Sequence, residues 1–550
     1  MAGLYGAQMH RTPPARRARS RQTRHRALAV VLLAATVTSA CSSMTAGTAT
    51  PGTTMHTSAG AKPSSSATST TTAEPAPGIT VPSTAAQPNA ASGEPDGAQG
   101  TIGDAGIGDP YYPLSGNGGY QIDSYDIDLK YDPDSNALSS TAKLTGTVTS
   151  DEGLTQFNLD LQPTMTVTGV DVNGAPATFE QQDAELVISP AELVAAQGAL
   201  VVEVAYAGEP DLIQGGTLGS DSGWYRTDSG GAIVIGEPYS ASSWYPVNEH
   251  PADTATFAVT ATVPQEWQVI SNGIRQTDGL PDPGAGNAVF RWALSDPVAS
   301  YLTTLYIDKF DVVEGKLADG KPIVSAIAPD ANDDARQLAD STGQILDVLS
   351  GYFGPYPFEA AGGIFTGLNT GYALETATRP VYGGGPIASF ETVVHELAHQ
   401  WYGDDVTVQR WSDICLNECF ASYAPWLYDA QVNKTDLDAQ WKQQMNSLVN
   451  QPRFWRSPLV DMGAGEEFTR VYDRGPLALH ALRAEIGDDA FFRLLKEWPA
   501  TYGGKNASFD ELEQFVNTLA GRDVTPFMDA WFRGTTVPDE QFRYPGNLGN

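Results

Sequence analysis

The segment His395-Glu-Leu-Ala-His399 constrains this 550-residue chain more than any other part of its sequence. Two histidines four residues apart lie on one face of an α-helix, where both imidazoles can bond a single metal ion. Glu418 follows after eighteen intervening residues, and a carboxylate from a second helix completes a ligand set that leaves one position open for water. The sequence therefore predicts one zinc ion per chain, held by His395, His399 and Glu418, with Glu396 as general base.

This pattern is specific because histidine is rare in the chain. With 7 His and 65 Asp plus Glu in 550 residues, about 0.01 accidental matches to His-Glu-x-x-His are expected. The alternative, a solvated helix with scattered polar side chains, requires that coincidence together with a suitably placed Glu418. The sequence favours the metal site.

The first forty residues are typical of a targeting segment. They contain seven Arg and no Lys, Asp or Glu, and the apolar run 27–40 is too short to span a bilayer comfortably. The run ends in Val-Thr-Ser-Ala-Cys41, which resembles a bacterial lipoprotein cleavage box. We expect a signal peptide over 1–40 and an exported protein anchored through a lipid on Cys41 to the outer face of the cytoplasmic membrane. An ordinary secretory signal cut nearby is the alternative.

Residues 41–108 are dominated by Ser, Thr, Ala, Pro and Gly, a composition that cannot bury a core. They are predicted to form a disordered linker. The formal net charge of the chain is −33, and it becomes −40 when the seven arginines of the targeting segment are removed. So acidic a chain binds nucleic acid poorly, and no nucleic-acid partner is expected.

Residues 109–313 carry the pattern of a β domain. Apolar and polar side chains alternate over 125–131, as in a half-buried strand. Similar short segments follow at 157–161, 167–172, 200–206, 256–263 and 301–310. Because no helical pattern interrupts them, they predict an antiparallel β domain.

Residues 314–537 carry helical patterns instead, and 538–550 form a tail. Helices are predicted over 330–353, 389–402 and 475–498, and from Ser508 onward. Asp413 is the expected N-cap of the helix that carries Glu418. The predicted fold class is therefore multidomain α+β, in which the β domain precedes a mainly helical catalytic domain.

The residues around the metal ligands resemble the zinc signature of the aminopeptidase N family. These residues are His395-Glu-Leu-Ala-His399-Gln-Trp-Tyr-Gly403 and Trp411-Ser-Asp-Ile-Cys-Leu-Asn-Glu418. Over roughly 109–537 the resemblance implies a saddle-shaped β domain followed by a thermolysin-like domain. It also implies a zinc-dependent aminopeptidase that acts on peptides with a free N-terminus. The chain ends soon after residue 532, which is similar to two-domain members that lack a long C-terminal helical domain.

The family's exopeptidase segment, Gly-Ala-Met-Glu-Asn, is matched by Tyr372-Ala373-Leu374-Glu375-Thr376. The resemblance implies that Glu375 binds the α-ammonium group of the substrate, since a carboxylate pairs with a cation at the chain end. It implies that Ala373 and Leu374 contact the substrate through their backbone. Tyr372 and Thr376 replace the usual Gly and Asn, so those backbone contacts are expected to differ.

Two further positions follow from the same resemblance. The segment Val471-Tyr-Asp-Arg-Gly475 resembles the family's Tyr-x-x-Gly, which implies that the Tyr472 hydroxyl donates a hydrogen bond to the oxyanion of the tetrahedral intermediate. Glu237, nine residues before Pro246, is similar in spacing to a β-domain Gln or Glu that also contacts the substrate amine.

Cys415 and Cys419 flank Glu418, and Cys419 stands where the family commonly has Gly. We expect buried packing cysteines, with a disulfide as an alternative in an oxidising compartment and thiolate competition for zinc as a weaker one. Three other functions remain open: a metalloendopeptidase whose cleft Tyr372 and Thr376 leave without a chain-end stop, a non-catalytic envelope peptide-binding protein, and an epoxide hydrolase.

Overall fold

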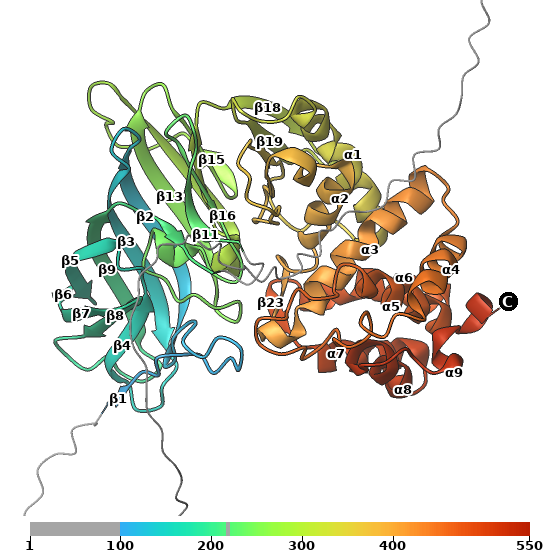
Figure 1. The fold of residues 1–550 in the computed structure, drawn as a ribbon. Helices are drawn as coiled ribbons and strands as arrows, with labels where there is room; N and C mark the ends of the chain where they lie inside the picture. Colours follow the sequence, from blue (N-terminus) through green and yellow to red (C-terminus); the bar gives the residue numbers. More distant parts are fainter. Residues whose placement is uncertain (1–99, 216–219, 550) are drawn as a thin grey trace, which may run out of the picture. The chain divides into compact units, whose positions relative to one another are not determined.

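The computed structural model describes residues 100–215 and 220–549 (Figure 1). The expected signal peptide, the lipidation site Cys41 and the predicted linker up to residue 99 lie outside the described residues. Among the helices of the described ranges, none is both long enough and apolar enough to cross a bilayer.

An eight-stranded sheet forms the centre of the β domain, in the order β15-β16-β13-β2-β3-β9-β5-β6. Neighbouring strands are antiparallel except β2 and β13, which run parallel. The strands are β2 (Tyr120–Asp132), β3 (Ala137–Val148), β5 (Met165–Val172), β6 (Ala175–Pro176), β9 (Ala199–Gly208), β13 (Thr254–Pro264), β15 (Ile274–Gln276) and β16 (Asn287–Ala299). Along β2, Ile127 and Leu129 are buried while Asp128 and Lys130 are exposed, so the alternation in the sequence gives the sheet one buried face.

Two smaller sheets accompany the large one. The first has the order β1-β4-β8-β7 and the second β10-β11-β12-β17-β14. Their strands are β1 (Thr101–Ile102), β4 (Leu154–Asp160), β7 (Thr178–Gln182), β8 (Glu185–Ser189), β10 (Leu212–Ile213), β11 (Ser222–Arg226), β12 (Ala232–Ile235), β14 (Gln268–Ser271) and β17 (Leu305–Asp308). Strand β1 lies in the segment predicted to be linker, yet it pairs with β4. Regular structure therefore begins before residue 109, where composition had placed the start of the β domain. The strand predicted over 301–310 is shorter, because a 3-10 helix occupies Ser300–Leu302.

The remaining part combines a small sheet with helices (Figure 1). The sheet has the order β18-β19-β20-β21, and β22 pairs separately with β23. These strands are β18 (Asp311–Lys316), β19 (Pro322–Ile327), β20 (Ile364–Phe365), β21 (Val381–Tyr382), β22 (Val406–Val408) and β23 (Lys505–Ala507). The helices are α1 (Ala335–Phe353), α2 (Phe390–His399), α3 (Cys415–Val432), α4 (Leu437–Leu448), α5 (Arg474–Ile486), α6 (Asp488–Tyr502), α7 (Phe509–Ala520), α8 (Thr525–Met528) and α9 (Glu540–Arg543). Strand β18 crosses the predicted boundary at 313/314.

Local sequence explains where these helices begin and end. The side chain of Ser389 caps α2 by accepting a hydrogen bond from the backbone of Thr392, and α2 ends at the second histidine of the motif. Asp413 is not the N-cap of α3: it lies in a 3-10 helix, and Ile414 occupies the cap. The single helix predicted over 475–498 is two helices, because Gly487 adopts a φ of 84° between α5 and α6.

Buried polar contacts join the β domain to the helical part. The Asp109 carboxylate lies 3.2 Å from His250 Nε2 and accepts a hydrogen bond from the backbone N–H of Trp411, next to α3. The Asn272 side-chain amide, at the end of β14, donates to the carbonyl oxygen of Ala377 at 2.7 Å. Because Glu375 lies two residues before Ala377, this contact holds the expected amine-binding loop against the β domain.

Candidate active site

Three donor atoms from α2 and α3 converge on one point. His395 Nε2 and His399 Nε2 are 3.1 Å apart, and Glu418 Oε2 lies 3.2 Å from the first and 3.5 Å from the second. Glu418 Oε2 is buried without a hydrogen-bond partner. Two facing imidazole nitrogens beside an unpartnered carboxylate oxygen fit a shared cation, and this N₂O donor set suits zinc.

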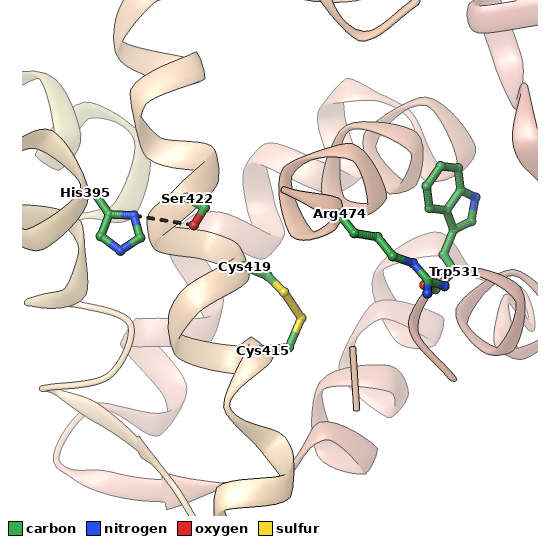
Figure 2. The surroundings of a disulfide bond; sticks show 6 residues. All are labelled: His395, Cys415, Cys419, Ser422, Arg474 and Trp531. Atoms are coloured by element: carbon green, nitrogen blue, oxygen red, sulfur yellow. Dashed lines mark hydrogen bonds between the residues drawn. A yellow bond between two sulfur atoms is a disulfide. The ribbon is translucent and has the colours of Figure 1, made fainter. Parts of the chain in front are cut away.

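Contacts behind the imidazoles orient them for metal binding. His399 Nδ1–H donates to the Tyr402 carbonyl oxygen at 3.0 Å, and His395 Nδ1 lies 3.4 Å from the Ser422 hydroxyl (Figure 2). A proton on Nδ1 leaves the Nε2 lone pair free for the metal. Burial raises the pKa of Glu418, but the two imidazoles outweigh that effect and bring it down to about 2. The ligand carboxylate is therefore ionised.

Glu396 follows the first histidine on α2, and its side chain is buried. A carboxylate oxygen of Glu396, one of Glu375 and a ring nitrogen of His399 all lie within 4.8 Å of one another. Burial raises the pKa of Glu396 well above its usual range, and the negative charges of Glu375 and Glu418 add to the effect while His399 opposes it. A carboxylate that binds protons this readily, beside the metal donors, is suited to proton transfer.

Glu237 and Glu375 bring two buried carboxylates together from the β domain and the helical part. Glu375 accepts a hydrogen bond from the Tyr301 hydroxyl at 3.2 Å, whereas Glu237 Oε1 is buried without a partner. Burial raises the pKa of Glu237, and the charge of Glu375 raises it further. Two buried acids, one of which raises the pKa of the other, suit a substrate ammonium group, which would stabilise their ionised forms.

The neighbouring residues of the exopeptidase segment are placed differently from one another. Ala373 is half-buried, whereas Leu374 is buried and bonds Val381 through both its N–H and its carbonyl, at 3.0 and 2.8 Å. The Leu374 backbone is thus already engaged by the segment that forms β21. Of the two positions expected to contact substrate through the backbone, Ala373 is the more accessible.

Tyr472 lies just before α5 and faces the metal donors. Its hydroxyl donates to Glu418 Oε1 at 3.2 Å, and its ring centroid lies 5.9 Å from that of His395. Burial raises the pKa of the phenol well above its usual range, and the charge of Glu418 contributes next. The hydroxyl therefore stays protonated and available as a hydrogen-bond donor.

Gln400 links several of these residues and was not singled out from the sequence. Its side-chain amide donates to the Glu375 carbonyl oxygen at 3.0 Å and to Asp404 Oδ2 at 2.6 Å. Its Oε1 accepts from the Thr378 N–H at 2.8 Å and from the Tyr356 hydroxyl at 3.2 Å. The only hint of this role in the sequence was its position directly after the second metal histidine. There its amide joins the end of α2 to the amine-binding loop.

Cys415 and Cys419 form a disulfide in the first turn of α3 (Figure 2). The sequence left packing cysteines, a disulfide and zinc-binding thiolates as alternatives, and the structure has the disulfide. The two sulfurs are engaged with each other, and Glu418 supplies the third donor of the metal site.

Comparison with known proteins identifies the family of the chain. The model of the peptidase M1 N-terminal domain matches residues 121–302, and that of the peptidase family M1 domain matches residues 387–531. The chain belongs to peptidase family M1.

A solved two-domain M1 zinc metallopeptidase, a variant bound to L-arginine, has a TM-score of 0.72 and 28% identity, and the match covers 79% of this chain and 99% of that one. The M1 zinc metallopeptidase from Deinococcus radiodurans has a TM-score of 0.69 and 28% identity over the same shares. These M1 structures confirm the predicted order of a sheet-rich domain and a helical domain.

Among curated M1 relatives, aminopeptidase N of Streptomyces lividans is 26% identical over 315 residues, which cover 52% of this chain and 36% of the relative. Human glutamyl aminopeptidase is 27% identical over 358 residues, which cover 58% of this chain and 36% of the relative. The chain thus spans about a third of the length of these relatives. The M1 family and its solved two-domain members are zinc metallopeptidases, which agrees with the zinc expected here.

Replacement of one metal donor tests the zinc site. In Glu418→Gln the ligand loses its charge, so we expect zinc affinity to fall by at least about 100-fold. Glu391→Gln is the matched control, because Glu391 is exposed in the first turn of α2. Elemental analysis of dialysed protein and titration with a zinc chelator measure both, and circular dichroism checks the fold. Equal affinity in the two variants would remove Glu418 from the ligand set.

Proposed function

We propose that the protein is a zinc-dependent aminopeptidase that hydrolyses the N-terminal bond of peptides with a free amine. The observation that carries the proposal is the convergence of the His395, His399 and Glu418 donors within 3.5 Å, beside the buried carboxyl groups of Glu375 and Glu237. The first group supports water-dependent hydrolysis and the second supports recognition of an ammonium group. Together they support a metallo-exopeptidase.

The chain's own residues divide the reaction between them. Zinc, when bound, supplies a Lewis acid that polarises the scissile carbonyl and makes the attacking water more acidic. Glu396 takes the proton of that water as the carbon–oxygen bond forms, and delivers it to the leaving amine as the carbon–nitrogen bond breaks. The Tyr472 hydroxyl donates to the oxyanion that develops on the carbonyl.

Glu375 and Glu237 would set the distance from the chain end to the scissile bond. An ammonium group held by both carboxylates lies next to the metal donors, so that the first peptide bond is the one presented to Glu396. The names of the M1 relatives support this assignment, since two of them are aminopeptidases. Solved neighbours are described as bound to L-arginine, to L-tryptophan and to a Tyr-Ser-Ala substrate, all of which are small ligands of the amino-acid or short-peptide type.

Loss of the general base tests the hydrolytic step. In Glu396→Gln the side chain no longer accepts a proton, so kcat should fall by about 10²- to 10⁴-fold while zinc content stays at one per chain. Hydrolysis of amino-acyl arylamides, measured with and without a chelator, gives the rates, and Glu391→Gln is the control. Full activity of zinc-loaded Glu396→Gln would exclude this role for Glu396.

Blocking the substrate amine tests the exopeptidase assignment. Wild-type protein should cleave free-amine peptides and leave their N-acetylated forms intact. In Glu375→Gln, kcat/KM for free-amine peptides should fall by about 10- to 100-fold, because one charged contact is lost. Glu314→Gln, an exposed acid on β18, is the control. Equal cleavage of acetylated and free peptides, or cleavage of an N-blocked protein at internal bonds, would favour the metalloendopeptidase alternative.

We also propose that the protein is exported and carries a lipid on Cys41, on the strength of the sequence before that residue. Expression in a bacterial host with a labelled fatty acid provides the test: wild-type protein should take up the label and fractionate with membranes, and Cys41→Ser should do neither. An unlabelled wild-type protein that is released in the same way as Cys41→Ser would support a simple secretory signal instead.

A further inference from the structure

The Cys415–Cys419 disulfide closes the turn of α3 that carries the metal donor Glu418 (Figure 2). Both cysteines are buried. The chain has three cysteines, and the third is Cys41. Both cysteines of the described residues therefore form the bond that encloses Glu418.

The disulfide also lies at a contact between α3 and the first turn of α5. A Cβ atom built on Gly475 would lie 2.7 Å from Cys419 Sγ, 2.9 Å from its Cβ and 3.0 Å from its Cα. No side chain larger than that of glycine fits between the helices there. The first turn of α5 therefore rests directly on the bonded sulfur of Cys419.

The start of α5 is fixed from its other side as well. Arg474 is fully buried, and its guanidinium group lies beside Trp531 (Figure 2). It donates to the carbonyl oxygens of Ser457 at 2.8 Å, Trp531 at 2.5 Å and Gly534 at 2.9 Å. These three bonds leave the helix start little freedom to retreat from Cys419. A change in volume at Cys419 must then be absorbed by the turn that carries Glu418 or by the segment that carries Tyr472.

These contacts form a closed circuit, a ring of four residues beside the metal site: Glu418, Cys419, Gly475 and Tyr472. Glu418 is bonded through the backbone to Cys419, which packs on Gly475. Tyr472 lies three residues before Gly475, and its hydroxyl returns to Glu418 Oε1 at 3.2 Å. The contact between Cys419 and Gly475 thus lies on the path of contacts that joins Glu418 to Tyr472.

We infer that the Cys415–Cys419 disulfide is a positioning element of the catalytic site, which holds the Glu418 carboxylate at the zinc and beneath the Tyr472 hydroxyl. The inference rests on the proposed zinc site. Two bonded sulfurs occupy less space than two thiols, and α5 leaves no room for the difference. Opening the bond therefore displaces the Glu418 turn or the Tyr472 segment.

Reductive opening is a balanced exchange with a dithiol. The dithiol supplies two electrons and two protons, its own sulfurs close to a disulfide, and Cys415 and Cys419 become thiols. Because both cysteines are buried, reduction should be slow in the folded protein. A variant without either sulfur is therefore the primary test.

The primary test compares wild-type protein with Cys415→Ala/Cys419→Ala. The variant loses the crosslink across the Glu418 turn and the sulfur on which α5 rests. We therefore expect zinc affinity, measured by competition with a chromophoric chelator, to fall about 10-fold or more, as is usual when support behind a metal ligand is lost. In the zinc-saturated variant kcat should fall, while KM for a free-amine peptide should change by less than about 3-fold, because Glu237 and Glu375 are not part of this circuit. Leu427→Ala, a buried change farther along α3, controls for general destabilisation.

A second variant isolates the contact itself. Gly475→Ala should weaken zinc binding and lower kcat in the disulfide-bonded protein, because its methyl group meets Cys419 Sγ. In the Cys415→Ala/Cys419→Gly background, where that sulfur is absent, the same substitution should have a much smaller effect. This partial rescue is not expected if Gly475 matters only for folding.

The outcomes separate this inference from the proposed function. The inference is overturned if Cys415→Ala/Cys419→Ala melts earlier yet keeps wild-type zinc affinity and kcat, which would make the disulfide a purely structural crosslink. It is also overturned if Gly475→Ala has equal effects in both backgrounds, or if wild-type protein purified without reductant contains two free thiols besides Cys41. A wild-type protein that binds no zinc would instead refute the proposed function.

Discussion

Three donor atoms meeting at one point between α2 and α3 is the constraint on which the rest of the active site depends. Glu418 Oε2 is buried between two imidazoles without a hydrogen-bond partner, which suits an oxygen that shares a cation with them. The surrounding structure maintains this geometry through the Tyr402 carbonyl behind His399, Gln400 at the end of α2, and the α5 start behind α3. The metal donors are thus supported on three sides.

Electrostatics gives the site a division of labour. Glu418 is ionised because two imidazoles face it, whereas burial and nearby negative charges raise the pKa of Glu396 and Glu237. In the proposed reaction these acids have separate tasks: metal binding, proton transfer and amine recognition. Tyr472 remains a donor for the same reason, since an ionised phenol would face the Glu418 charge.

The sequence predicted those parts of the molecule that depend on local periodicity. Alternation predicted β2, and the spacing of His395 and His399 predicted one face of α2, because both follow from residue repeats within one element. Contacts across long separations were not accessible in this way. The parallel pairing of β2 with β13, the β1–β4 pairing and the packing of Gly475 on Cys419 each join segments far apart in sequence or leave no periodic trace. Gly487 was readable as a helix breaker, but the apolar pattern on either side concealed it.

The proposed recognition of the substrate N-terminus requires carboxylates from both the β domain and the helical part. Glu237 belongs to the β domain. Glu375 lies in the loop whose Ala377 carbonyl oxygen accepts a hydrogen bond from Asn272 of the β domain. The proposed amine-binding site is therefore formed jointly by the β domain and the helical part, and neither part contains it alone. Because Glu375 also lies close to Glu396 and His399, a change at this junction would affect amine recognition and the metal site together.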